Sequence, residues 1–344
     1  MRMKTTDDLR PAKFAAGIIV ALVILCAGAS LGSSAISLFD TVSIVFHKLS
    51  GRPFTEGMDL KLVSIVWNLR LPRAILAFIV GGALAVSGTV FQSVLKNPLA
   101  SPFIVGVSSG ASLGAGLVML SGIALPLIGA FTMPIAGFLF GLATVFFVIF
   151  CASKIDKTLS NNTIILFGMV FSLFVNAIIT LLVALYREQL KNLLYWQMGS
   201  FALKGWNYAG LMLPFLVVGL LGTLCYTKEM DILTFGDEQA KSIGVNTKGL
   251  RIKLLFFSTV LTGGAVALSG VIGFVDLIAP HLARKIVGAK HKDVIPMAFI
   301  IGGSLLVLTD LIARTVVSPS ELPVGAVTAI IGAPFFAWVY FRKK

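Results

Sequence analysis

The chain has 344 residues, of which 57% are hydrophobic and only 12% are charged, and its formal net charge at pH 7 is +13. A water-soluble domain of this composition would lack the polar side chains that face solvent, so the sequence indicates a polytopic membrane protein. The basic residues lie between apolar runs and form no stripe, which argues against a nucleic-acid-binding surface. The three cysteines lie inside apolar runs, so no disulfide framework is expected.

The apolar runs predict an all-α membrane protein with ten membrane-spanning helices in one transmembrane domain, residues 1–344. The first run is interpreted as a retained helix, because no signal-peptide cleavage site separates it from further apolar chain. The segment 33–68 mixes polar and apolar residues and is expected outside the membrane, whereas 187–206 is amphipathic and suits the interface. The expected spans are about 14–32, 71–95, 101–120, 125–152, 163–186, 208–226, 254–271, 273–287, 295–312 and 324–340.

A short repeat relates the two halves of the chain. Residues 81–88 (GGALAVSG) recur 182 positions later as residues 263–270 (GGAVALSG), with six of eight residues identical. The copies lie on spans 2 and 7, an odd number of crossings apart, so they run in opposite directions. This predicts an inverted repeat of spans 2–5 (about 69–186) and spans 7–10 (about 251–341).

The repeated residues are small, which lets a neighbouring backbone come close in lipid. The simpler explanation is that Gly, Ala and Ser are common in membrane helices. The positions expected to pack closely are Gly81, Ala85, Gly88, Gly263, Gly264 and Gly270.

The basic residues orient the chain. With both termini and the turns after spans 2, 4, 6 and 8 in the cytoplasm, 19 of the 28 Lys and Arg residues lie inside and 9 outside. Five of those nine lie in the long loop at 48–73, which the positive-inside rule constrains less than short loops. We therefore expect a multi-pass protein of the cytoplasmic membrane with both termini inside.

No motif for enzymatic chemistry stands out in the sequence. It contains no Walker A sequence and no Gly-Lys dipeptide, so it offers no phosphate-cradling loop of that kind. Its histidines, His47, His281 and His291, show no metal-ligand spacing. We expect no enzymatic activity, no metal site and no cofactor bound by this chain.

Two aspartates lie within or at the edges of apolar spans, where a carboxylate is costly and usually faces the bundle interior or a partner. Asp310 lies four residues before Arg314, and an i,i+4 ion pair accounts for it. Asp276 has no such neighbour. Two hypotheses stay open for Asp276: it lines a transport pathway, or another helix supplies its partner.

Seven sequence runs lie in a characteristic order between positions 69 and 336. They are LRLPR (69–73), GGALAVSG (81–88), NPLASPFIVGVSSGA (97–111), GDEQAKSIGV (236–245), SGVIGFVDLIAPHLARKIVG (269–288), DLIAR (310–314) and ELPVGAVTAIIGAPFF (321–336). In order and spacing these runs resemble those of the permease subunits of type II ABC importers for iron siderophores, heme and vitamin B12, the FecCD-type permeases. The resemblance implies a homodimer, or a pseudo-dimer with a similar permease. It also implies two separate cytoplasmic ATPase subunits that use ATP, and an external substrate-binding protein.

The resemblance also implies a coupling segment at about 228–250, between spans 6 and 7. Its residues match the coupling motif of ABC permeases in spacing, although Gln239 departs from that motif. A solvated helix-turn-helix is compatible with the same residues. The coupling residues would be Asp237, Glu238, Ala240 and Gly244.

By the same resemblance, two short turns at the inner mouth would form a cytoplasmic gate. Helix capping by the two adjacent asparagines explains those residues equally well. The gate residues would be Asn97, Leu99, Asn161 and Asn162.

At the outer ends of spans 2 and 9, Arg70, Arg73 and Arg314 would dock acidic residues of the binding protein. An arginine suits this role because its planar fork holds a carboxylate through two hydrogen bonds. Anchoring of helix ends among lipid headgroups is the alternative for these three residues.

We therefore expect the permease of an ATP-driven importer of an iron complex. A ferric siderophore is favoured on family frequency, with heme and vitamin B12 as alternatives. An ion-coupled secondary transporter would also show inverted repeats, but it needs ion-binding groups at the midplane, and only Asp276 is a candidate. A non-transporting anchor or receptor fits ten spans poorly.

Overall fold

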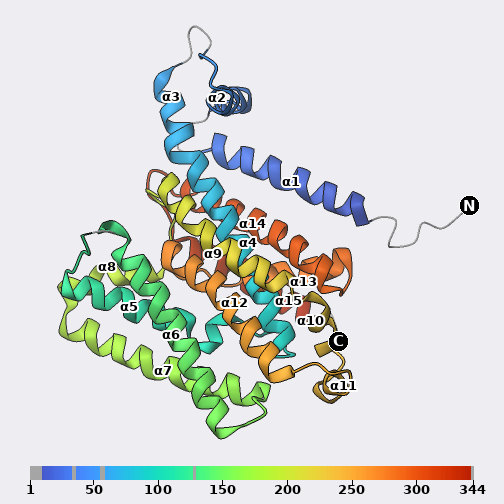
Figure 1. Ribbon diagram of the computed structural model, residues 1–344. Helices are drawn as coiled ribbons and strands as arrows, with labels where there is room; N and C mark the ends of the chain where they lie inside the picture. The colour runs from blue at the N-terminus through green and yellow to red at the C-terminus, as the bar shows by residue number, and fades with distance from the viewer. Residues whose placement is uncertain (1–9, 33–35, 55–58, 127–128, 342–344) are drawn as a thin grey trace, which may run out of the picture.

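All regular structure is helical in the computed structural model, which describes residues 10–32, 36–54, 59–126 and 129–341 (Figure 1). Within these ranges, ten helices correspond to the ten predicted spans. These are α1 (Arg10–Ser30), α4 (Leu71–Val94), α5 (Val107–Ser121), α6 (Thr132–Ile155), α7 (Asn161–Leu185), α9 (Trp206–Leu224), α12 (Thr247–Ser269), α13 (Val275–Val287), α14 (His291–Thr315) and α15 (Val324–Phe341).

Not all ten helices are long. In the described part of the chain, seven helical segments are long and apolar enough to cross a membrane, and α5 and α15 are shorter apolar helices. The third span was predicted to begin near Ser101, but α5 begins at Val107. The difference arises because Pro102–Val105 forms a separate 3-10 turn, which Gly106 ends with a φ of 93°.

Shorter elements lie at the two ends of the bundle. Two of them, α10 and α11, form the connector between α9 and α12, and we call that end of the bundle the connector end. The N-terminal half of α1 lies there, because Lys13 donates a hydrogen bond to the carbonyl oxygen of Ile286, and the C-terminus lies nearby (Figure 1). The short elements are α2 (Leu38–Ser50), α3 (Leu60–Ser64), a π-helical turn (Ile65–Arg70), α8 (Arg187–Gln197), α10 (Thr227–Leu233), α11 (Asp237–Ser242) and a 3-10 turn (Gly129–Phe131).

Helices α4 and α12, which carry the repeated octapeptide, occupy the centre of the bundle. Most residues of both are buried, whereas α1, α7 and α9 bury only about a fifth of their apolar windows. The peripheral helices therefore present apolar side chains to lipid, and the central pair packs against protein. Helix α4 packs on α14, α12 packs on α6, and α4 and α12 pack on each other. In the predicted inverted repeat, α12 corresponds to α4 and α6 corresponds to α14. The α4–α14 and α12–α6 contacts are therefore equivalent, as the repeat predicts.

The small residues of the repeat allow these close approaches. A Cβ atom added to Gly81 would lie 2.3 Å from the carbonyl oxygen of Gly302, and one added to Gly88 would lie 2.0 Å from that of Asp276. Ala85 also faces Gly302. The α12 copy is equally crowded: Gly263 lies against Phe138, Gly264 against Phe215, and Gly270 against the carbonyl oxygen of Trp196.

Candidate functional site

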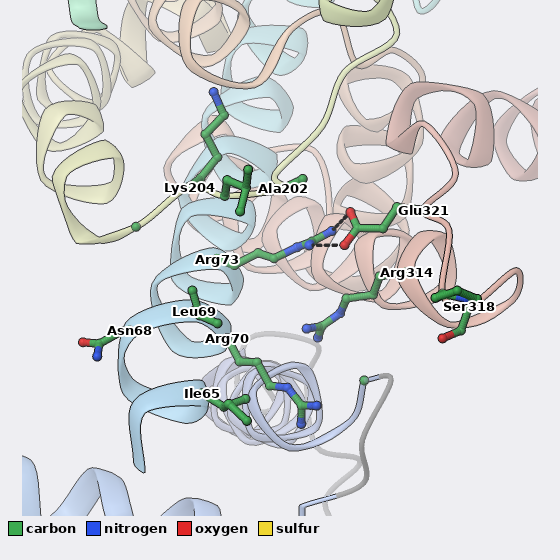
Figure 2. A pocket seen from close by; sticks show the side chains of 14 residues that line it. Ile65, Asn68, Leu69, Arg70, Arg73, Ala202, Lys204, Arg314, Ser318 and Glu321 are labelled. Atoms are coloured by element: carbon green, nitrogen blue, oxygen red, sulfur yellow. Dashed lines mark hydrogen bonds and ion pairs between the residues drawn. The ribbon is translucent and has the colours of Figure 1, made fainter. Parts of the chain in front are cut away.

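The three arginines predicted at the outer surface converge on one cavity, at the end of the bundle opposite the connector (Figure 2). We call this end the arginine end. Its cavity has a volume of about 590 Å³ and is bordered by the start of α4, the end of α14 and the loops before α9 and α15. Arg70, Arg73 and Arg314 are between 6% and 8% exposed, so their guanidinium groups line a recess instead of extending into solvent.

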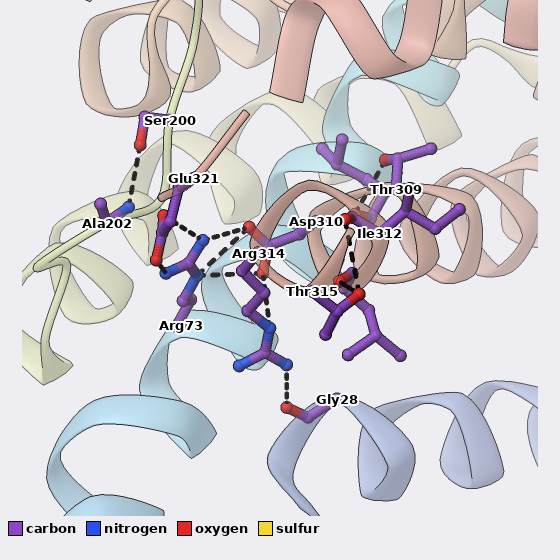
Figure 3. A network of polar contacts seen from close by, with 12 residues as sticks. Gly28, Arg73, Ser200, Ala202, Thr309, Asp310, Ile312, Arg314, Thr315 and Glu321 are labelled. Carbon is purple, nitrogen blue, oxygen red and sulfur yellow. Dashed lines mark hydrogen bonds and ion pairs between the residues drawn. The ribbon is translucent and has the colours of Figure 1, made fainter. Parts of the chain in front are cut away.

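Arg73 lies between two carboxylates. Its Nε and Nη2 atoms donate hydrogen bonds to Asp310 at 2.8–3.2 Å, and its Nη1 and Nη2 atoms donate to Glu321 at 2.8 and 2.9 Å (Figure 3). The predicted i,i+4 ion pair between Asp310 and Arg314 is present, with Arg314 Nε 3.8 Å from Asp310 Oδ2. The shorter distances make Arg73, on another helix, the main partner of Asp310. This contact is possible because α4 and α14 cross closely.

The other two arginines bind the carboxyl end of α1. Arg314 Nη2 donates to the carbonyl oxygen of Gly28, and Arg70 Nη1 donates to that of Ser30 at 2.5 Å. The last carbonyls of a helix lack partners within that helix and carry partial negative charge. These contacts therefore give Arg70 and Arg314 a structural role in addition to any docking role.

Two more charged side chains border the cavity. Burial lowers the pKa of Lys204, in the loop before α9, to about 8. The hydrogen bond from Arg73 lowers the pKa of Glu321, in the loop before α15, which keeps this partly exposed carboxylate ionised. The cavity thus contains four basic side chains and one acidic side chain, with Asp310 behind Arg73.

The predicted gate residues lie in two turns at the connector end. Asn97 follows α4, and its side-chain oxygen accepts a hydrogen bond from the Leu99 amide at 2.9 Å. In the second turn, Asn161 and Asn162 are the first residues of α7, and the cap position belongs to Ser160. Neither asparagine therefore occupies the cap position of α7.

Asp156 organises this second turn, and the sequence analysis missed it. Its carboxylate accepts hydrogen bonds from the amides of Thr158 and Ser160, both at 2.8 Å. Hydrogen bonds from these two residues lower the pKa of Asp156 well below its usual range. A signal was present, because Asp156 is followed by Thr158 and Ser160, which is a typical Asx-turn pattern.

The connector consists of two short helices joined by Gly236. Gly236 and Gly244 have positive φ angles of 127° and 91°, so each permits a sharp turn. Gly244 lies between α11 and the long helix α12, so its turn does not join two short helices. Ala240 is fully buried, and Glu238 is exposed.

A contact between α10 and the start of α14 joins the connector to the bundle. Asp231 on α10 lies 2.6 Å from Nδ1 of His291 and accepts a hydrogen bond from the His291 amide at 2.9 Å. The other ring nitrogen of His291 lies 2.5 Å from Ser93 Oγ on α4. His291 is therefore a buried structural residue that holds α10 against the ends of α4 and α14.

Asp276 is paired by another segment of the chain. It lies in the first turn of α13, where the helix dipole favours a negative charge, and Ser101 donates a hydrogen bond to its carboxylate. Gln92 on α4 donates to the Asp276 carbonyl oxygen at 3.3 Å, and Arg284 donates to Gln92 at 2.5 Å. Ser101, in another segment, thus binds one carboxylate oxygen of Asp276, whereas the other, Oδ1, is buried without a hydrogen-bond partner in the described part of the chain.

The long apolar helices in the described part of the chain, packed around a buried central pair, are typical of a multi-pass membrane protein. The sequence matches the FecCD transport family over residues 19–342. The chain belongs to this family.

Individual relatives match along nearly their whole length. An uncharacterized ABC transporter permease protein of Bacillus subtilis is 38% identical over 342 residues, covering 98% of this chain and 97% of the relative. The hemin transport system permease protein of Yersinia pestis is 35% identical, covering 95% of each chain. Among solved structures, an inward-facing metal-chelate type ABC transporter superposes with a TM-score of 0.83 at 29% identity, covering 96% of this chain and 99% of the other.

Proposed function

We propose that this chain is the permease subunit of an ATP-driven importer that moves an iron complex, a ferric siderophore, across the cytoplasmic membrane. The observation that carries the proposal is the match to the FecCD transport family over residues 19–342, supported by the fold shared with a metal-chelate transporter. Relatives named for hemin, cobalamin and ferric citrate share 35–38% identity with the chain, so heme and vitamin B12 are the alternative substrates.

The connector end faces the cytoplasm in this proposal, and the arginine end faces outward. The excess of basic residues in the turns at the connector end supports this orientation through the positive-inside rule. It places both termini inside. It also places the cavity with its four basic side chains where an external protein can reach it.

Three protein partners follow from this orientation. An ABC ATPase dimer that uses ATP binds at α10 and α11, with the exposed Glu238 available for contact. A substrate-binding protein places an acidic side chain in the arginine cavity, where the basic groups attract it. A second copy of this permease completes the pathway as a homodimer, and this chain itself binds no cofactor.

Uptake by the reconstituted complex tests the proposal. The permease is assembled in proteoliposomes with its partner ATPase, and the cognate binding protein is supplied outside with a ferric siderophore, hemin or cobalamin. We expect uptake of the ferric siderophore only when ATP is present inside. Uptake of hemin or cobalamin alone would assign the alternative substrate, and uptake driven by an ion gradient without ATP would contradict the importer.

A further inference from the structure

Asp237, the first residue of α11, binds two basic residues from different parts of the bundle. Its Oδ1 accepts a hydrogen bond from Lys96 Nζ at 2.7 Å, and its Oδ2 accepts one from Arg251 Nη2, also at 2.7 Å. Lys96 lies in the turn after α4, which also contains Asn97 and Leu99. The carboxylate of Asp237 therefore connects α11 directly to the first gate turn.

Arg251 extends this connection to the second gate turn. Its Nη1 donates a hydrogen bond at 2.7 Å to the carbonyl oxygen of Leu159, in the turn between α6 and α7. The Arg251 side chain is only 2% exposed, and Asp237 is its ion-pair partner. Loss of the Asp237 carboxylate would leave a buried guanidinium without that counter-charge, which is costly and would loosen its hold on Leu159.

The surroundings show why these polar contacts matter. Lys96, Asp237 and Arg251 border a cavity of about 260 Å³ together with the three residues at the start of α7. Close-packed side chains do not fill this cavity. Around it, the polar contacts of Asp237 and Arg251 connect the two turns to α11. Contacts between charged groups are stronger and more directional than neutral hydrogen bonds, which suits them to hold two turns in one arrangement.

Electrostatics keeps the Asp237 carboxylate ionised. Burial acts to raise its pKa, but the hydrogen bond from Lys96 and the positive charge of Arg251 outweigh burial, and the pKa is lowered. The contacts therefore persist across the physiological pH range.

We propose that Asp237 is a positioning residue that ties both gate turns to α11, so that a movement of the connector moves the two turns together. Its carboxylate faces the bundle, which leaves its exposed neighbour Glu238 to contact the ATPase. The role in transport rests on the proposed function above. The link between α11 and the two turns is a property of the permease itself and is testable without ATPase or substrate.

Hydrogen exchange of the permease in lipid nanodiscs tests the link directly. Asp237→Asn is nearly isosteric at a partly exposed site, so the fold should persist, and Asp237→Ala serves as a second variant. We expect exchange to accelerate about fivefold in both turns, residues 95–101 and 156–163, for either variant. Lys96→Met should accelerate the first turn only, because the Arg251 contacts remain.

A double variant and a matched control complete the measurement. The pair Lys96→Met with Asp237→Ala should match Asp237→Ala alone in the first turn, because both changes remove the same contact. Lys241→Met removes an exposed lysine from the same helix and should leave both turns unchanged. Acceleration of one turn or neither by the Asp237 variants would overturn the proposal, as would a Lys96→Met effect on both turns.

Transmission is then measured in the assembled importer, as substrate moved per ATP hydrolysed. We expect Asp237→Asn to lower this ratio about fivefold while ATP hydrolysis continues. An unchanged ratio in a variant whose two turns have loosened would overturn the role in transmission. If no tested substrate is moved while the exchange pattern appears as expected, the proposed function fails and the link stands.

Discussion

Arg73 on α4 and Asp310 on α14, 237 positions apart, form a two-point ion pair in which Nε–Oδ2 is 3.0 Å and Nη2–Oδ1 is 2.8 Å. The pair lies at the arginine end of the contact between these helices, whose middle is the close approach of Gly81 and Gly302. Backbone packing thus holds α4 and α14 together in the middle of their contact, and the ion pair holds them together at the arginine end. This arrangement makes Arg73 part of the fold as well as part of the cavity.

The first prediction separates the two partners of Arg73. Asp310 is 1% exposed, so Asp310→Asn leaves a buried guanidinium with a weaker partner, and we expect a loss of about 3 kcal/mol of unfolding free energy. The Glu321 side chain is 37% exposed, so Glu321→Gln should cost less than about 1 kcal/mol. Denaturant unfolding in detergent measures both variants, and equal losses would contradict the assignment of Asp310 as the main partner.

The second prediction concerns docking of the binding protein at the cavity. Glu321 offers a carboxylate to Arg73 where an acidic side chain of the partner would bind, so Glu321→Gln should speed association about threefold, more at low salt than at high salt. Surface plasmon resonance with immobilised nanodiscs gives the rate. Arg73→Glu would be a poor test, since it places three carboxylates together. An association rate unchanged by Glu321→Gln at every salt concentration would count against docking at this cavity.

Lys204 supplies the third prediction, a dependence of docking on pH. Its pKa is lowered by burial to about 8, so the ammonium loses its proton as the pH rises through 8. Association with an acidic partner should therefore slow by about threefold between pH 7 and pH 9. The Lys204→Met variant should associate slowly with the partner at both pH values. The sign for stability is opposite: because the unfolded chain holds this proton up to about pH 10.4, Lys204 contributes stability that rises with pH from about 8.

The fourth prediction tests the turn at Gly244. Its φ of 91° suits glycine, and an added Cβ meets nothing within 4 Å, so Gly244→Val adds backbone strain without a collision with other residues. We expect substrate-stimulated ATP hydrolysis in the assembled importer to fall about tenfold while membrane insertion stays normal. Gly210→Ala is the control, because Gly210 lies within helix α9 and a Cβ atom added there also meets nothing within 4 Å. Normal substrate stimulation of ATP hydrolysis in the Gly244→Val importer would contradict a coupling role for Gly244.

The sequence predicted the spans well because hydrophobic length is a local property. It also predicted that three arginines share one end of the bundle, since this follows from counting crossings. It missed the Arg73–Asp310 pair, which depends on how two helices cross, and favoured the local i,i+4 partner Arg314 instead. It did not predict the two ion pairs of Asp237, because the rotation of the six-residue helix α11 is set by tertiary contacts with Lys96 and Arg251.

The last prediction uses Asp276 to distinguish an ATP-driven importer from an ion-coupled transporter. Ser101 donates a hydrogen bond to its carboxylate, and an asparagine oxygen accepts the same bond, so Asp276→Asn should change uptake less than twofold. Asp276→Gly removes the acceptor and leaves a buried hydroxyl without it, which should cost about 1–3 kcal/mol of unfolding free energy.

Uptake in proteoliposomes, normalised to the amount of folded permease, measures both variants, and Ser101→Ala is the matched control from the other side of the contact. A carboxylate that carried a coupling proton would behave differently, because the amide of Asp276→Asn does not titrate. Loss of uptake by more than tenfold at a normal amount of folded protein, with Ser101→Ala fully active, would therefore favour ion-coupled transport over the ATP-driven importer.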